Sequence, residues 1–184
     1  MANWIIAGIA LPLLLYLIVI YNRLVRLRAL MREAWSGITV QLRRRADLVP
    51  NLVSAVKAYA SHERDLLEAV TAQRGVAAGT KGVGETAQAD ALLSGMLGRL
   101  MAVAEAYPAL KADANFRELQ QELAETEDEL AGARRYYNAT VRDLNTAVES
   151  FPAILVAAPM GFRQEEPYSD PDTSIRTAPN VEFG

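Results

Sequence analysis

Two charged runs contain the residues of this chain with the most potential for chemistry. The run ETEDE at 125–129 places four carboxylates within five residues, which suits either a metal site or acid–base catalysis. The run QLRRRADLVPN at 41–51 places three consecutive arginines and a proline inside an otherwise helix-like pattern. A solvated helix surface would also explain either run. The role of each run therefore depends on the helix that contains it and on the residues that this helix packs against.

The composition removes most other kinds of site chemistry. The 184 residues include no cysteine and one histidine, His62, which excludes disulfides, thiol nucleophiles and paired-histidine metal sites. A di-iron bundle needs Glu-x-x-His pairs, whereas Tyr59 stands three residues before His62. The glycine-rich stretch 75–86 lacks the spacing and the Gly-Lys-Ser/Thr ending of a phosphate-binding loop. We predict no catalytic residue, no metal, no cofactor and no small-molecule substrate.

An apolar stretch near the N-terminus predicts a transmembrane helix. Residues 4–21, WIIAGIALPLLLYLIVIY, contain no charged residue and would form about 27 Å of helix, close to the thickness of a hydrocarbon core. A cleaved signal peptide is the alternative, but a basic region before the stretch and a small-x-small cleavage signal after it are both missing. We therefore expect a retained anchor.

The charge that follows this stretch predicts its orientation. From residue 22 to residue 57 there are eight Lys or Arg against two acidic residues, although the whole chain has a net charge of −3. The membrane-proximal basic residues are Arg23, Arg26, Arg28 and Arg32. By the positive-inside rule, residues 1–3 face outward and the remainder is cytoplasmic. Attraction of these arginines to anionic lipid headgroups is compatible with that role.

Apolar residues then recur in steps of three and four, which predicts a long packed helix. The stripe consists of Trp35, Ile38, Leu42, Val49, Leu52, Val56, Tyr59, Leu66 and Val70. Arg43 and Arg44 face away from it, but Arg45 falls on the stripe if the helix keeps its register through Pro50. Arg45 then needs a carboxylate or carbonyl partner, for which Glu127 is the first choice, or a kink at Pro50 that lets it reach solvent.

The rest of the chain predicts further helices and no strand. We expect a loop at 75–86, a helix at 87–106, a third long helix from about 115 to 151, and a short fourth helix within 153–162. The expected stripe of the helix at 87–106 is Leu92, Met96, Leu100 and Val103. The expected stripe of the third helix is Phe116, Leu119, Leu123, Leu130, Tyr137, Val141, Leu144, Val148 and Phe151. Residues 163–184 read as an extended tail that Val181 and Phe183 could pin to the bundle.

Asn138 and Asn145 lie seven residues apart beside the stripe of the third helix. Asparagines at heptad spacing can fix helix register through buried hydrogen bonds, and we favour this interpretation over ligand binding. The fold class predicted is all-α: a transmembrane helix at 4–21 followed by a long-helix antiparallel up-and-down bundle at 22–162.

Three long segments of the chain resemble the LemA family. They are YNRLVRLRALMREAWSGITVQLRRRADLVPNLVSAVKAYASHE, AEAYPALKADANFRELQQELAETEDELAGARRYYNATVRDLNTAVESFP, and MGF with the closing APNVEF. The resemblance implies a single-pass bacterial membrane protein with a bundle of long helices and no established catalytic residue or cofactor. It also implies that residues 43–51, with Asp47 and Asn51, form a shared structural or interaction element.

The function expected is that of a membrane-anchored helical scaffold or protein-interaction protein in the bacterial inner membrane, without catalytic activity. Its partners would be the lipid bilayer and an unidentified protein, including a second copy of the chain, but not nucleic acid. One alternative is an accessory subunit of a membrane protease or transporter. The weaker alternative is a hydrolase that uses the carboxylates at 125–129.

Overall fold

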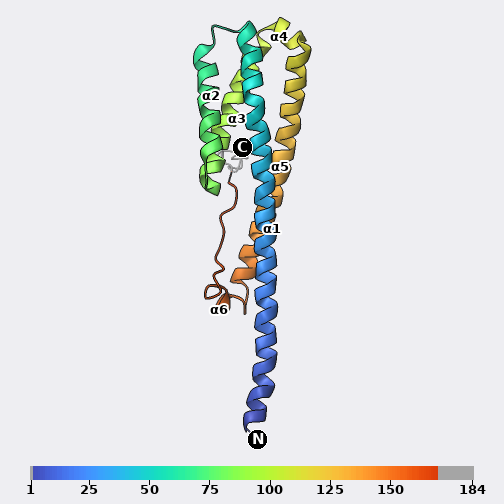
Figure 1. The fold of residues 1–184 in the computed structure, drawn as a ribbon, viewed down its shortest axis with the longest axis vertical. Coiled ribbons are helices and arrows are strands. Elements are labelled where there is room, and N and C mark those ends of the chain that lie inside the picture. The colour runs from blue at the N-terminus through green and yellow to red at the C-terminus, as the bar shows by residue number, and fades with distance from the viewer. Residues whose placement is uncertain (1, 170–184) are drawn as a thin grey trace, which may run out of the picture. The chain divides into compact units, whose positions relative to one another are not determined.

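The computed structural model describes residues 2–169, with side chains from Ala10 onward. In this part of the chain every regular element is a helix: α1 (Ala2–Tyr59), α2 (Arg64–Gly79), α3 (Val83–Glu105), α4 (Pro108–Ala112), α5 (Ala114–Glu149) and α6 (Ile154–Ala157). Figure 1 shows α1 and α5 as the two long helices. The predicted all-α class is confirmed. Val181 and Phe183 lie outside the described residues.

Helix α1 is continuous because its buried residues repeat every seven positions. Leu24, Met31, Ile38, Arg45 and Leu52 are all at most 8% exposed. Pro50 lies inside the helix without ending it, and its side chain is exposed. The kink that would have released Arg45 to solvent is therefore not needed, since the helix keeps its register through the proline.

The chain divides into two compact units. Among the described residues, the first contains 2–38 and 133–167, and the second contains 39–132 and 168–169. Both long helices contribute to both units, because the division cuts α1 after Ile38 and α5 after Gly132.

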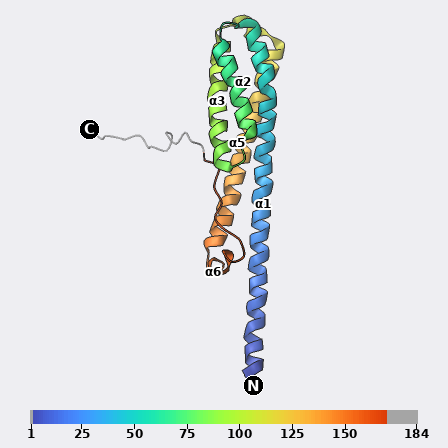
Figure 2. The same cartoon turned by 60° about the vertical axis from the view of Figure 1, so that its left-hand side comes forward.

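The second unit holds the larger apolar core. Figures 1 and 2 show α2 and α3 side by side with the later turns of α1 and the first half of α5. The core is formed by Leu48, Val49, Leu52, Val56, Ala60, Leu67, Val70, Leu93, Leu97, Leu100, Ala104, Leu110, Phe116 and Leu123. Asp113 begins α5, since its carboxylate accepts the backbone N–H of Phe116 at 3.0 Å in the manner of an N-cap.

The first unit is built where α5 returns along the early part of α1. The rings of Trp35 and Tyr137 pack with centroids 5.4 Å apart. Beyond α5 the chain turns through α6, and the ring of Phe162 meets that of Tyr21 edge-on at 5.9 Å. Leu24 and Leu144 are each 1% exposed in this unit.

The structure corrects the predicted bounds in several places. The first stripe does not continue to Val70, because α1 ends at Tyr59 and a turn at 60–63 leads into α2. The loop expected at 75–86 shortens to residues 80–82, since alanines between the glycines allow helix up to Gly79. Helix α4 was not predicted, and Pro108 occupies its first turn. Phe151, expected on the buried stripe of α5, is 82% exposed.

Candidate functional site

Arg45 lies at the centre of a buried polar cluster in the second unit. Its side chain is 1% exposed and occupies a core position of α1. The guanidinium donates to the Asp90 carboxylate on α3, to the Ser94 hydroxyl at 2.7 Å, and to the Glu127 carboxylate on α5 at 2.9 Å. It also reaches the Asp90 carbonyl at 3.2 Å. The structure thus contains the buried pairing and not the escape to solvent.

Asp90 is the partner that sequence reasoning missed. It is 2% exposed, and its second carboxylate oxygen accepts the hydroxyl of Tyr168 at 2.5 Å. A signal was present, because Asp90 lies on the buried stripe of α3, which is formed by Thr86, Asp90, Leu93, Leu97, Leu100 and Ala104 in alternating steps of four and three. An acidic residue on one apolar stripe and a basic residue on another are natural partners.

The cluster is an ion network that is buried at Arg45 and Asp90 and reaches solvent at Glu127. One guanidinium faces two carboxylates, of which Asp90 is buried and Glu127 is 38% exposed. Among the described residues, the Nε of Arg45 is buried without a hydrogen-bond partner. A buried charge needs paired and hydrogen-bonded surroundings, and here three helices and the segment with Tyr168 provide them. The arrangement suits fixing the mutual register of α1, α3 and α5.

Three of the four carboxylates at 125–129 are engaged in structural contacts. Glu125 accepts from Gln121 at 2.9 Å, and Glu129 pairs with Arg44 at 3.3 Å with both side chains about half exposed. Glu127 belongs to the Arg45 cluster. Within residues 2–169 there is no group of three His, Cys, Asp or Glu side chains arranged to hold a metal ion.

The other candidate polar residues of the arginine-rich stretch lie at the surface. Arg43 and Asn51 are exposed. Asp47 is 68% exposed and lies 3.8 Å from Arg74 of α2, whose Nε donates to the Ala46 carbonyl at 2.6 Å. The structure therefore brings Arg44, Arg45 and Glu127 into ion pairs but leaves Arg43 and Asn51 outside this cluster.

Asn145 fastens the segment that follows α6 in the first unit. Its amide donates to the Glu165 carbonyl at 2.9 Å and accepts the Glu165 backbone N–H at 2.8 Å. The hydroxyl of Tyr137 donates to the Glu166 carbonyl at 3.0 Å. Burial and the nearby charges of Glu165 and Glu166 raise the pKa of Tyr137 to about 12. Asn138 is half-buried on the same helix.

The membrane-proximal arginines divide into two kinds. Arg23, Arg26 and Arg32 are exposed. Arg28 is half-buried, donates to the Gly161 carbonyl at 2.5 Å, and lies 3.9 Å above the centre of the Phe162 ring. A cation over an aromatic face is favourable, so Arg28 holds the chain after α6 against α1.

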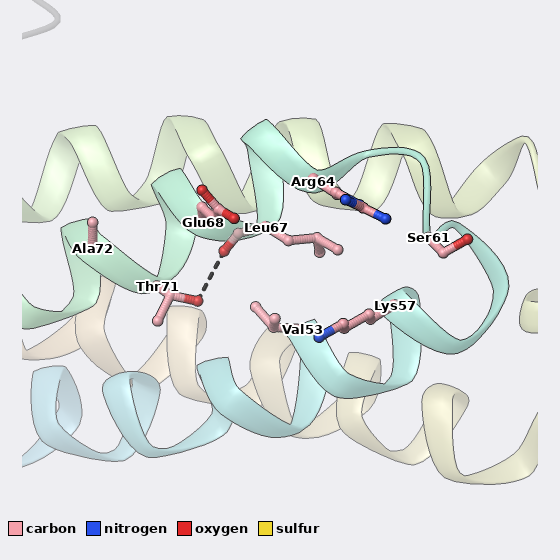
Figure 3. A pocket seen from close by; sticks show the side chains of 8 residues that line it. All are labelled: Val53, Lys57, Ser61, Arg64, Leu67, Glu68, Thr71 and Ala72. Atoms are coloured by element: carbon pink, nitrogen blue, oxygen red, sulfur yellow. Dashed lines mark hydrogen bonds between the residues drawn. The ribbon is translucent and has the colours of Figure 1, made fainter.

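An open groove of about 660 Å³ lies between the last turns of α1 and the first half of α2. Figure 3 shows its lining: Val53, Lys57, Ser61, Arg64, Leu67, Glu68, Thr71 and Ala72. The hydroxyl of Thr71 is turned inward to the Leu67 carbonyl at 2.8 Å. Lys57 and Arg64 outnumber the one carboxylate of the lining, Glu68, so the groove is net positive beside the apolar Val53, Leu67 and Ala72. This composition suits contact with an acidic, partly apolar segment of a protein.

Helix α1 also contains the described part of the apolar stretch. It is the one helix, within the described residues, that is long and apolar enough to cross a membrane. Leu11, Leu13, Leu14, Leu15, Ile18 and Val19 are each 47% or more exposed. Exposed large aliphatic side chains in such a row are unfavourable in water, and lipid would cover them.

Comparisons with known proteins identify a family and relatives of this chain. The family model described as "LemA family" matches residues 34–183. The magnetosome proteins MamQ 1 and MamQ 2 of Paramagnetospirillum magneticum are each 28% identical over 186 residues, which cover 85% of this chain and 68% of each relative. Magnetosome protein MamQ of Magnetospirillum gryphiswaldense is 27% identical with the same coverage.

Proposed function

The chain belongs to the LemA family, and from this premise we propose that it is a membrane-anchored helical scaffold that presents its bundle to a protein partner. The single observation that carries the proposal is the composition of α1. This one helix combines an exposed apolar stretch at its start with buried core positions at its later turns. An anchor and a folded domain built on one helix suit a protein that holds a partner at a membrane.

Binding of a partner, and not catalysis, is the role that the polar groups support. Three of the four carboxylates at 125–129, those of Glu125, Glu127 and Glu129, contact Gln121, Arg45 and Arg44, which gives these three a structural use. The groove beside α2 is the candidate partner site in the second unit, because it joins apolar side chains with Lys57 and Arg64. From the magnetosome relatives we carry over the LemA-type architecture only.

The topology proposed is a single membrane crossing with the bundle in the cytoplasm. The exposed arginines Arg23, Arg26 and Arg32 support it, since basic residues that flank a span favour the cytoplasmic side. Protease added to outer-membrane-permeabilised cells should leave the chain after Asn22 intact. Digestion of the bundle from outside would reverse the orientation.

Crosslinking in intact membranes tests the scaffold function directly. We expect a protein crosslinked through the groove to be lost when Lys57→Glu and Arg64→Glu are combined, while the melting temperature stays unchanged. Lys111→Glu on α4 is the control, because Lys111 is exposed and does not line the groove. Crosslinks that survive the groove substitutions would contradict this site.

The identity of the crosslinked protein separates the alternatives. Recovery of one membrane protease or transporter would support the accessory-subunit role, and recovery of the chain itself would support self-association. If the wild-type chain in intact membranes gives no crosslink to a protein from any position of the bundle, the scaffold function is contradicted.

A further inference from the structure

Three large apolar side chains gather at the point where the chain leaves α5. Phe151 is 82% exposed, Ile154 is 52% exposed and Leu155 is 66% exposed. We name residues 151–157, the turn together with α6, the elbow. Single exposed apolar residues are common, but three within five positions at one turn form a patch that calls for a partner.

The inner side of the elbow is well packed, so the exposure is not a sign of a loose segment. Ala157 is 1% exposed and Phe162, which follows the elbow, is 2% exposed. The backbone of α6 continues into further turns, with the Phe162 N–H bonded to the Ala157 carbonyl at 2.9 Å. A fixed backbone therefore presents the three apolar side chains.

The elbow lies beside the end of the apolar stretch of α1. Phe162 meets the ring of Tyr21, which is the last residue of the uncharged stretch 4–21. Gly161 accepts from Arg28, two turns further along α1. Figures 1 and 2 both show α6 beside α1, beyond the last turn of α5. If residues 4–21 cross the hydrocarbon core, the elbow lies where the chain enters the headgroup layer.

Exposed basic side chains outnumber acidic ones around the elbow, although Glu149 is exposed at the end of α5 just before it. Arg23 and Arg26 are exposed on the first turns of α1 after the apolar stretch, and Arg163 is exposed just after Phe162. Basic side chains beside exposed aromatic and aliphatic ones are the composition of segments that lie in a membrane interface. This surface therefore suits the boundary between headgroups and acyl chains better than a protein interior.

We propose that the elbow is a second membrane contact, which inserts Phe151, Ile154 and Leu155 into the interface of an anionic bilayer while Arg23, Arg26 and Arg163 bind lipid phosphates. This proposal rests on the anchoring of residues 4–21 proposed above. It goes beyond anchoring, because a second contact point fixes the orientation of the first unit relative to the bilayer. A single transmembrane helix leaves its tilt angle free.

The absence of native cysteine allows single spin labels to test the elbow in the full chain. Phe151→Cys, Ile154→Cys and Leu155→Cys are labelled with a nitroxide and reconstituted into vesicles of phosphatidylcholine and phosphatidylglycerol. We expect the labels to collide readily with oxygen, which dissolves in lipid, and to be shielded from a water-soluble nickel relaxant. Leu92→Cys is the matched control, because Leu92 is 58% exposed on α3 and should stay accessible to nickel.

Further labels separate the elbow from the anchor. Leu15→Cys reports the span itself: a shielded Leu15 label with elbow labels as accessible as the Leu92 label would overturn the elbow proposal and leave the anchor intact. A nickel-accessible Leu15 label would overturn the anchoring. Mutual dipolar broadening of the elbow labels, without contact with oxygen in lipid, would assign the surface to a second copy of the chain.

A separate comparison tests whether the arginines bind anionic lipid. In vesicles of phosphatidylcholine alone, or with Arg23→Gln and Arg26→Gln combined, we expect the elbow labels to become at least twofold more accessible to nickel. Equal shielding in all three conditions would overturn the role assigned to the arginines. Unchanged circular dichroism and melting of every labelled chain shows that the fold is intact.

Discussion

Arg45 of α1 and Asp90 of α3 form an ion pair in which both side chains are almost completely buried, with 1% and 2% of their surfaces exposed. The pair joins two helices at the level of their apolar cores. Two further residues contact the pair: the hydroxyl of Tyr168 donates to the Asp90 carboxylate, and the Glu127 carboxylate accepts from Arg45. Because both charges have lost their water, each depends on the other.

The first prediction concerns loss of the central cation. Arg45→Ala should lower the free energy of unfolding by about 3–5 kcal/mol, since it strands buried Asp90 without a counter-charge. Arg44→Ala is the matched control on the adjacent residue and should cost at most about 1 kcal/mol, because its pair with Glu129 is half exposed. Thermal unfolding followed by circular dichroism in detergent measures both. Equal, small losses would contradict a structural role for the cluster.

The second prediction ranks the two carboxylates. In double-mutant cycles with Arg45→Ala, Asp90→Asn should show a larger coupling energy than Glu127→Gln, because solvent screens the 38%-exposed Glu127 and not Asp90. The coupling should fall in the range of about 0.5–3 kcal/mol found for residues in direct contact. A stronger coupling to Glu127 would contradict the assignment of Asp90 as the main partner of Arg45.

The third prediction isolates the hydroxyl of Tyr168. Tyr168→Phe keeps the buried ring but removes the hydrogen bond to the Asp90 carboxylate, so stability should fall by about 1.5–3 kcal/mol, the usual range for a bond to a charged group. In the Asp90→Asn background, Tyr168→Phe should lower the free energy of unfolding by less than it does in the wild-type chain. Strictly additive losses would show that the hydroxyl does not support the ion pair.

The fourth prediction uses the raised pKa of Tyr137. The pKa is about 12 in the folded chain against 10.0 for an ordinary tyrosine, so folding favours the neutral phenol. Its contribution is complete below pH 10 and is lost as the pH rises towards 12. Tyr137→Phe should be less stable than wild type below pH 10, and this difference should vanish or reverse at higher pH. Denaturant unfolding across this window measures it, and a constant difference would contradict the assignment.

The fifth prediction concerns Asn145. Asn145→Ala removes both hydrogen bonds to Glu165 and should speed amide exchange at Glu165 and its neighbours while α5 remains helical. Asn145→Asp, which can accept but not donate, should give an intermediate effect. Hydrogen exchange in residues 163–168 reads this out, and unchanged protection there would contradict the contact.

Sequence reasoning succeeded where a pattern repeats. The third long helix was expected from about 115 to 151 and is α5, Ala114–Glu149, because buried residues at Phe116, Leu123, Leu130, Tyr137 and Leu144 recur every seven positions. The placement of Arg45 on the buried stripe of α1 followed from the same reasoning. That placement required α1 to keep its register through Pro50, and the helix does so.

Sequence reasoning failed where the fold joins distant segments. The turn at 60–63 was missed because the apolar spacing happens to continue from Val56 into Leu66 and Val70, on the next helix. Asp90 was missed because the stripe expected on its helix ran through Leu92, Met96, Leu100 and Val103, whereas Leu92 is 58% exposed and the buried face contains Asp90, Leu93 and Leu97. Asn145 was expected to pair between helices, whereas its partner is the backbone of the segment after α6, which has no periodic signal.

The contacts of Asn145 and Tyr137 have a consequence for how this protein can change over evolutionary time. Both side chains bind backbone atoms of Glu165 and Glu166, so they recognise the path of the chain and not the residues on it. Almost any replacement at positions 165 and 166, proline at 165 excepted, leaves these bonds available. Deleting or inserting one residue after Phe162 would instead displace both carbonyls from their donors. In a library of random variants, this segment should tolerate many amino-acid substitutions but no insertion or deletion.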